Sequence, residues 1–165
     1  MIYRTKTYIA ADWTGDKNAV EQLYKWKDSE YWQLDFNDAH ELTQSSDDSL
    51  NCSIKDSLRE RLDHSKTFVL IVGNKTKTLR AGECTYCSKN YKCGNSSNKS
   101  FIEYECDKAV RDDLKIIVLY NAATVDKTKC LDSLKYLGTH TAMQCIKNGE
   151  RYWDYQAVKE AMGLN

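Results

Sequence analysis

The chain has 165 residues, the size of one domain, and its 24 lysines and arginines balance its 24 aspartates and glutamates. A net charge of zero gives no reason to expect general affinity for nucleic acid or for an anionic membrane surface. The apolar runs are far shorter than the roughly 20 residues that span a bilayer. The first residues, MIYRTKTYIAADW, lack the apolar core of a signal peptide, so we expect a cytoplasmic protein.

The first half of the chain predicts three strands separated by two helices. Residues 7–12 (TYIAAD) form a continuous apolar run, as in a strand buried on both faces, and an apolar stripe at helical spacing follows over 19–24. Residues 31–38 (YWQLDFND) alternate apolar and polar side chains, which predicts an edge strand. A second helical stripe covers 54–62, and residues 67–73 (TFVLIVG) predict another buried strand.

The second half continues this alternation. Residues 102–110 carry a third stripe at helical spacing, and residues 115–121 (KIIVLYN) predict a buried strand. A short helix is expected over 132–137, a fifth strand over 139–146 (THTAMQCI), and a last helix over 153–162, after the turn signal KNGE.

Strands that alternate with helices predict an open parallel sheet with helices on both faces. Placing the alternating strand at the edge gives a flavodoxin-like three-layer α/β/α sandwich, with a five-stranded parallel sheet of order 2-1-3-4-5. No linker divides the chain, so residues 1–165 are expected to form a single domain with a cysteine-containing insert at 74–99.

Ligands of such sheets bind beyond the carboxyl ends of the strands. The predicted topology brings Asp12 and Trp13, after the first strand, and Asp38 and His40, after the second, to this rim. The chain has no G-x-G-x-x-G turn after its first strand, no Walker A motif and no G-x-S-x-G elbow. These absences argue against a classical dinucleotide dehydrogenase, a P-loop nucleotidase and an α/β-hydrolase.

The helix expected after residue 100 begins SFIEYE and carries two acids. With Ser100 as N-cap, Glu103 completes a capping box and has a structural role. Glu105 has no such role, because it follows Phe101 by four positions and lies next to the apolar stripe. From its spacing, Glu105 is either a solvated carboxylate favoured by the helix dipole or a functional group.

Four stretches together resemble a bacterial TIR-like domain of the Thoeris anti-phage defence, ThsB-type group. They are KTYIAAD, DFNDAHEL, SIKDSLRERLDHSKTFVLIVGNKTKTLR and FIEYECDKAVRDDLKIIVLYN, which lie within roughly residues 5 to 121. The tail from about residue 138 to 165 resembles a C-terminal extension found in one branch of this group.

The resemblance implies an NAD+-consuming enzyme, a nucleosidase or ADP-ribosyl cyclase, that makes a nucleotide second messenger for a separate effector. In this family a catalytic glutamate follows an aromatic residue by four positions, and Phe101 and Glu105 match that pattern. NAD would be the substrate, and self-association is expected. The alternative is a non-catalytic adaptor or nucleotide-sensing module. The classical arginine–aspartate motif and Pro-Gly turn are missing after residue 38, which favours that alternative.

The residues expected to bind NAD are Asp12, Trp13, Asp38, His40 and Phe101. Three of them have a structural alternative. Asp12 either binds a ribose hydroxyl or ends a strand in a turn. Trp13 either stacks on a ligand ring or packs over the sheet edge. His40 either bonds a ribose or phosphate or is a loop histidine without a role.

Seven cysteines without a secretory signal do not indicate a disulfide framework. The stretch CTYCSKNYKC places Cys84, Cys87 and Cys93 close together, and a C-x-x-C pair is half of a typical zinc site. A second such pair is missing. We therefore expect no required metal, with a structural zinc at these three cysteines as the alternative and Cys106 or a histidine as its fourth ligand.

Overall fold

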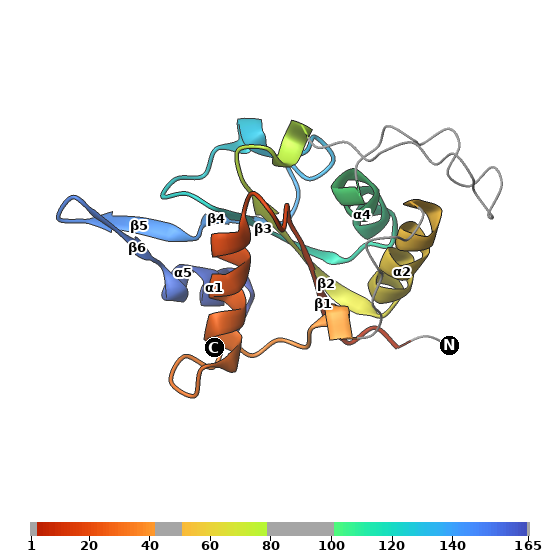
Figure 1. Ribbon diagram of the computed structural model, residues 1–165, viewed down its shortest axis with the longest axis horizontal. Helices are drawn as coiled ribbons and strands as arrows, with labels where there is room; N and C mark the ends of the chain where they lie inside the picture. Colours follow the sequence, from red (N-terminus) through yellow and green to blue (C-terminus); the bar gives the residue numbers. More distant parts are fainter. Residues whose placement is uncertain (1–2, 42–50, 79–100, 165) are drawn as a thin grey trace.

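Four parallel strands form the centre of the protein (Figure 1). The computed structural model describes residues 3–41, 51–78 and 101–164. The strands β1 (Lys6–Ala10), β2 (Ser65–Val72), β3 (Lys115–Tyr120) and β4 (Thr139–Ala142) lie side by side in chain order. The chain is therefore an α/β protein with a parallel sheet, as its alternating pattern predicts.

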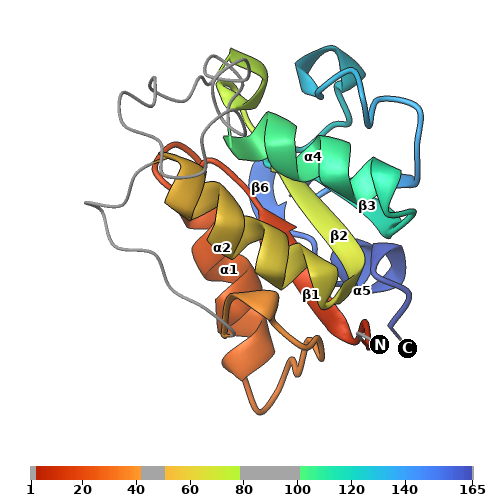
Figure 2. The same cartoon turned by 90° about the vertical axis from the view of Figure 1, so that its right-hand side faces the viewer.

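Helices cover both faces of this sheet. On one face lie α2 (Asn51–Asp63) and α4 (Phe101–Arg111), which are in front of the strands in Figure 2. On the other face lie α1 (Lys17–Asp28) and α5 (Tyr155–Ala161). Short 3-10 helices occupy Ala39–Glu41, Thr76–Thr78 and Lys127–Lys129.

Alternate residues of the strands enter two separate cores. Tyr8 and Phe68 pack under α2 and α4, whereas Ile9 and Val69 pack under α1 and α5. Because side chains point to both faces and both faces are covered, the strands read as continuous apolar runs rather than as alternating ones. This is why β1, β2 and β3 are recognisable from the sequence.

The strand predicted at residues 31–38 does not form. Its only strand-like contact is an isolated parallel bridge between Thr7 and Asp38. Gln33 has a positive φ of 50°, and the Leu34 N–H donates to the Trp26 carbonyl at 3.0 Å instead of to a neighbouring strand. The alternation reflects burial of Leu34 and Phe36 in a loop. The predicted five-strand order 2-1-3-4-5 is therefore not confirmed.

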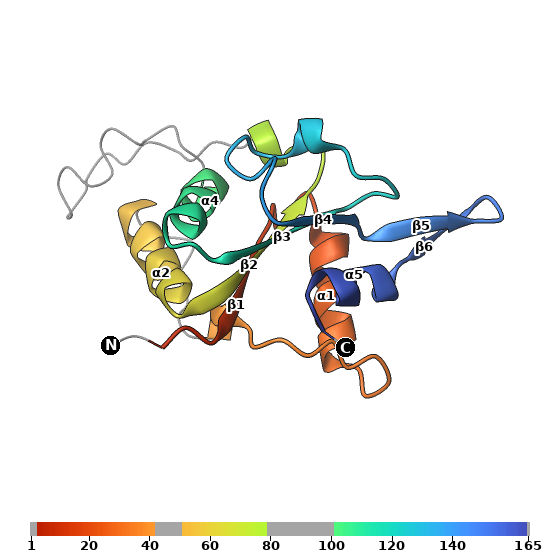
Figure 3. The ribbon, with the colours of Figure 1, turned by 180° about the vertical axis from the view of Figure 1, so that it is seen from behind.

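The strand predicted at residues 139–146 is divided into two. It breaks at the fully buried Met143, and its second part, β5 (Gln144–Lys147), pairs antiparallel with β6 (Glu150–Trp153). Asn148 and Gly149, with φ of 53° and 78°, make the two-residue turn between them. The signal KNGE thus marks a hairpin, which extends away from the sheet in Figure 3.

Two helix predictions also need correction. The last helix begins at Tyr155, not at residue 153, because Trp153 ends β6 and Asp154 caps the helix by accepting from the Ala157 N–H at 3.1 Å. Residues 132–137 form turns rather than the predicted short helix. None of the helices in the described ranges is sufficiently long and apolar to cross a membrane.

Candidate functional site

The helix α4 directs Glu105 into the protein. Its apolar stripe of Ile102, Cys106 and Ala109 packs on the sheet, and Glu105 lies beside this stripe with only 6% of its surface exposed. The solvated helix carboxylate considered from the spacing is therefore wrong. The neighbouring acid Glu103 is half-buried in the first turn of the same helix, and Ser100 of the predicted capping box lies outside the described residues.

Glu105 is held by a buried tyrosine of the central sheet. The Tyr8 hydroxyl donates a hydrogen bond to the Glu105 carboxylate, and the Tyr8 residue on β1 is 1% exposed. The positive charge of Arg61, at the end of α2, also acts on this carboxylate. The second carboxylate oxygen, Oε2, is buried and has no hydrogen-bond partner in the described part of the chain. Glu105 thus has one hydrogen-bonded oxygen and one buried oxygen without a donor among the described residues.

Burial controls the charge of Glu105. Loss of hydration raises its pKa to about 8, although the Tyr8 hydrogen bond and the Arg61 charge act in the opposite direction. At neutral pH the side chain is mostly the neutral acid. A cation placed beside it would shift it toward the carboxylate.

A row of aromatic rings leads from Glu105 toward the surface. The centroid of the His40 ring lies 4.9 Å from that of Tyr8, and the Trp13 ring lies 5.3 Å from that of His40. Trp13 is 45% exposed. We call Glu105, Tyr8, His40 and Trp13 the acid–aromatic row. It joins three of the residues expected at the site from sequence and adds Tyr8.

Asp38 holds His40, the middle ring of this row. Its Oδ1 accepts from the His40 backbone N–H at 3.0 Å and contacts His40 Nδ1 at 3.2 Å. Burial acts to raise the pKa of Asp38, but hydrogen bonds from the His40 ring, Tyr24 and the His40 backbone outweigh it and lower the pKa below its ordinary value. Asp38 therefore stays ionised and orients the imidazole.

Asp12 has a structural role in the loop after β1. Its Oδ1 accepts from the Thr14 N–H at 3.2 Å, and its carbonyl accepts from the Asp16 N–H at 2.8 Å. Of the two roles expected for Asp12, a ribose ligand or a turn residue, these hydrogen bonds are those of a turn residue. The same turn positions the neighbouring Trp13. Phe101 packs, partly buried, against the core under α2 and α4.

A second polar network lies beyond the carboxyl end of β3. Asn121 Nδ2 donates to Asp16 Oδ1 at 3.0 Å, Gln144 Nε2 donates to Asn121 Oδ1 at 3.0 Å, and Arg151 Nη1 donates to Gln144 Oε1 at 2.9 Å. Burial raises the pKa of Asp16, whose residue is 4% exposed. The network connects the start of α1 to the β5–β6 hairpin.

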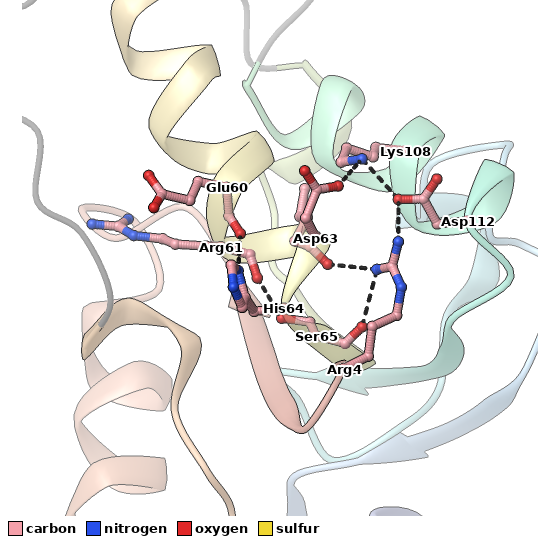
Figure 4. Close-up of polar contacts among 9 residues, drawn as sticks. Arg4, Glu60, Arg61, Asp63, His64, Ser65, Lys108 and Asp112 are labelled. Atoms are coloured by element: carbon pink, nitrogen blue, oxygen red, sulfur yellow. Dashed lines mark hydrogen bonds and ion pairs between the residues drawn. The ribbon is translucent and has the colours of Figure 1, made fainter. Parts of the chain in front are cut away.

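An ion-pair cluster fixes α4 against α2 (Figure 4). Lys108, 6% exposed, lies one turn beyond Glu105, and its Nζ lies 2.7 Å from Asp63 Oδ1 and 2.8 Å from Asp112 Oδ2. Arg4 pairs with the same Asp112 oxygen at 3.3 Å and donates to the Leu62 carbonyl at 2.8 Å. Arg61 lies on α2 and Glu105 on α4, so the ion pairs that join these helices also hold the two charges near each other.

Sequence reasoning missed Tyr8 and Arg61. Tyr8 could have been predicted to contact a polar group, because it lies in an otherwise aliphatic buried strand and a buried phenol needs a hydrogen-bond partner. Arg61 lies in a charged helix, and nothing in its local pattern distinguishes it from its neighbours.

No metal cluster is present among the residues that the structure describes. Cys106 and Cys130 are buried free thiols on the α2 and α4 face. The predicted zinc ligands Cys84, Cys87 and Cys93 lie outside the described residues.

Comparison with known families identifies part of this architecture. No curated protein matches the chain. A family model described as Thoeris protein ThsB, TIR-like domain, matches residues 8–81. This range contains Tyr8, His40 and Arg61 and ends before α4 and Glu105. Over residues 8–81, the chain is therefore similar to the TIR-like domain of the Thoeris protein ThsB.

Proposed function

We propose that this protein is an NAD+-consuming TIR-like enzyme of anti-phage defence, with Glu105 as its catalytic carboxylate. The observation that carries the proposal is a buried glutamate that accepts a hydrogen bond from Tyr8 and lies next to a row of aromatic rings. The family match supports the defence setting. NAD+ would be the substrate, and the product would be a nucleotide signal read by a separate effector after self-association of the enzyme.

The chemistry needs one well-placed carboxylate. Breaking the bond between nicotinamide and ribose leaves the bonding electrons on the nicotinamide nitrogen, and positive charge builds at the anomeric carbon. Nicotinamide leaves as a neutral molecule and needs no general acid. The Glu105 carboxylate would stabilise the developing cation until water, in hydrolysis, or a nucleophile of the same molecule, in cyclisation, bonds to that carbon.

The burial of Glu105 makes its charge respond to the substrate. Unliganded, the group has a pKa of about 8 and is mostly protonated at neutral pH. The nicotinamide ring of NAD+ is cationic, so its arrival favours the ionised carboxylate. The Tyr8 hydroxyl also favours the ionised form by donating to it. Oε2, which has no donor in the described part of the chain, would be the oxygen that contacts the ribose.

The outer members of the acid–aromatic row would bind the rest of the substrate. Trp13 is half-exposed and offers a flat surface on which an aromatic base can stack. His40, oriented by Asp38, would donate to a ribose or phosphate oxygen. Phe101, at the start of α4, would close the apolar side of this site.

The test is product analysis by mass spectrometry after incubation of NAD+ with the wild type, Glu105→Gln and Glu103→Gln. Glu103 lies on the same helix and is the matched control. We expect nicotinamide and an ADP-ribose product from the wild type and from Glu103→Gln. Glu105→Gln should lose at least about 100-fold in rate, the scale of removing one electrostatic stabiliser. Equal rates for Glu105→Gln and wild type would exclude Glu105.

A non-catalytic ligand-sensing module is the second candidate, and the neutral state of Glu105 favours it. A protonated acid binds a ligand by hydrogen bonding but cannot stabilise a cation. In this case, calorimetry would detect NAD+ binding, while concentrated, self-associated protein would release no nicotinamide.

A further inference from the structure

A groove of about 690 Å³ opens at the amino ends of the strands, away from the acid–aromatic row. It lies between the segment around Phe36, the first residues of β1, β2 and β3, and the turn after α5. Glu105 and Tyr8 belong to the opposite face of the sheet, under α2 and α4. The volume is within the roughly 300–1,000 Å³ typical of small-molecule sites.

The floor of the groove is a row of polar side chains across three strands. Thr7 pairs in register with Thr67, and Thr67 pairs with Lys115. Two residues further along, the same face continues with Ile9, Val69 and Ile117, which are all fully buried. On this face, three adjacent strands therefore carry polar residues at their amino ends and aliphatic residues two positions further along. Since neighbouring strands lie about 4.8 Å apart, the three backbone positions span about 10 Å.

The Lys115 ammonium is held over the backbone of the turn that ends α5. Gly163 has a φ of 70°, and a Cβ at this position would lie 2.6 Å from Lys115 Nζ. A larger residue at 163 would displace the ammonium, so glycine here serves both the left-handed turn and the approach of Lys115. The turn also places Met162 and Leu164 along the groove.

The charges of the groove favour an anion. Lys66 and Lys115 line it, and neither forms an ion pair with another residue of the described ranges. Asp35 is the acidic residue among the lining residues. Two ammonium groups and two threonine hydroxyls match the donors that a phosphate oxygen accepts from. Met162 and Leu164 supply an apolar wall.

We propose that this groove binds a small phosphate-bearing ligand with an apolar or aromatic part, of the size of a nucleoside monophosphate. The phosphate lies over Thr67 and Lys115, with Lys66 neutralising a further charge. The base or other apolar part lies against Met162 and Leu164. The site is separate from the proposed NAD+ site and does not depend on catalysis by Glu105.

The experiment is calorimetric titration of the purified protein with AMP and with inorganic phosphate as probes. Lys115→Met and Thr67→Val remove one donor each, and both should fold, since Lys115 is exposed and the valine has the shape of the threonine. Lys147→Met, on the exposed hairpin, is the matched control.

We expect saturable binding of AMP that weakens as salt rises. Each groove variant should bind about tenfold more weakly, the scale of a lost hydrogen bond to a charged group, and Lys147→Met should bind like the wild type. The proposal is overturned if AMP does not bind at millimolar concentration. It is also overturned if AMP binds equally well to Lys115→Met and the wild type, since AMP would then occupy another site.

Discussion

The Tyr8 hydroxyl donates a hydrogen bond to Glu105 in the core between the sheet and α4. Both residues are almost completely buried, with 1% and 6% of their surfaces exposed. The pair joins the first strand of the matched TIR-like segment to a helix outside it. Burial raises the pKa of Glu105 and this hydrogen bond opposes it, which leads to the first prediction.

Replacing Tyr8 with Phe removes the hydroxyl that donates to this carboxylate while keeping the ring that stacks on Phe68. A hydrogen bond to the charged form lowers the pKa of an acid, so its loss should raise the pKa of Glu105 above about 8. NMR titration of ¹³C-labelled glutamate side chains measures this shift directly. An unchanged or lower pKa in Tyr8→Phe would show that the hydrogen bond does not favour the ionised form of Glu105.

Burial of Glu105 should make the protein less stable as the pH rises. Its pKa is about 8 when folded and 4.5 in the reference state, so between these values the folded form binds a proton that the unfolded form lacks. Stability is then lost at up to about 1.4 kcal/mol per pH unit. Below pH 4.5 this penalty is absent.

The variant Glu105→Gln cannot ionise and should escape this penalty. Urea unfolding at several pH values should show Glu105→Gln gaining stability relative to the wild type as the pH rises from 5 to 8.5. Glu103→Gln should show no such gain. Parallel curves for wild type and Glu105→Gln would mean that Glu105 is solvated in the folded protein.

Much of the sheet is predictable from sequence because β1, β2 and β3 are buried on both faces, and burial leaves continuous apolar runs. The alternation at 31–38 misleads because a loop whose side chains alternate between core and solvent produces the same pattern as an edge strand. The strand at 139–146 misleads because its hydropathy does not reveal that the chain changes sheets at Met143.

In the candidate site too, some residues could be predicted from the sequence and others could not. Trp13 follows β1, as its position in the sequence predicts. Asp38 and His40 are expected to follow a strand over 31–38 that does not form, and the isolated bridge between Thr7 and Asp38 brings this segment beside β1 instead. Tyr8 and Arg61 act on Glu105 through contacts between elements distant in sequence. Such contacts leave no local pattern, and only the packing of α2 and α4 against β1 reveals them.

Removing the buried ammonium of the ion-pair cluster should destabilise the protein. In Lys108→Met, Asp63 and Asp112 lose their closest cation, although Arg4 still contacts Asp112. Because Asp63 is partly exposed, we expect a loss of about 2–3 kcal/mol, below the usual cost of breaking a fully buried pair. Chemical unfolding measures it, with Lys147→Met as control. A loss within error of the control would show that the cluster is not stabilising.

Gly73 should not tolerate a side chain, because the Asp16 carboxylate occupies the space. A Cβ on Gly73 would lie 2.0 Å from Asp16 Oδ1. Gly73→Ala should therefore cost about 1–3 kcal/mol, typical of overpacking. Combining it with Asp16→Ala removes the clash, so the double variant should be more stable than the sum of the single changes predicts. If the losses of stability in the two single variants simply added in the double variant, the alanine side chain would not clash with Asp16.

The most direct test of the account is the rate of nicotinamide release from NAD+ as a function of pH. For kcat/KM, which reports the ionisation of the free enzyme, the account predicts a rise as Glu105 ionises around its pKa of about 8. It also predicts almost no release by folded Glu105→Gln at any pH. Release by Glu105→Gln at the wild-type rate, with the wild-type pH profile, would contradict the account.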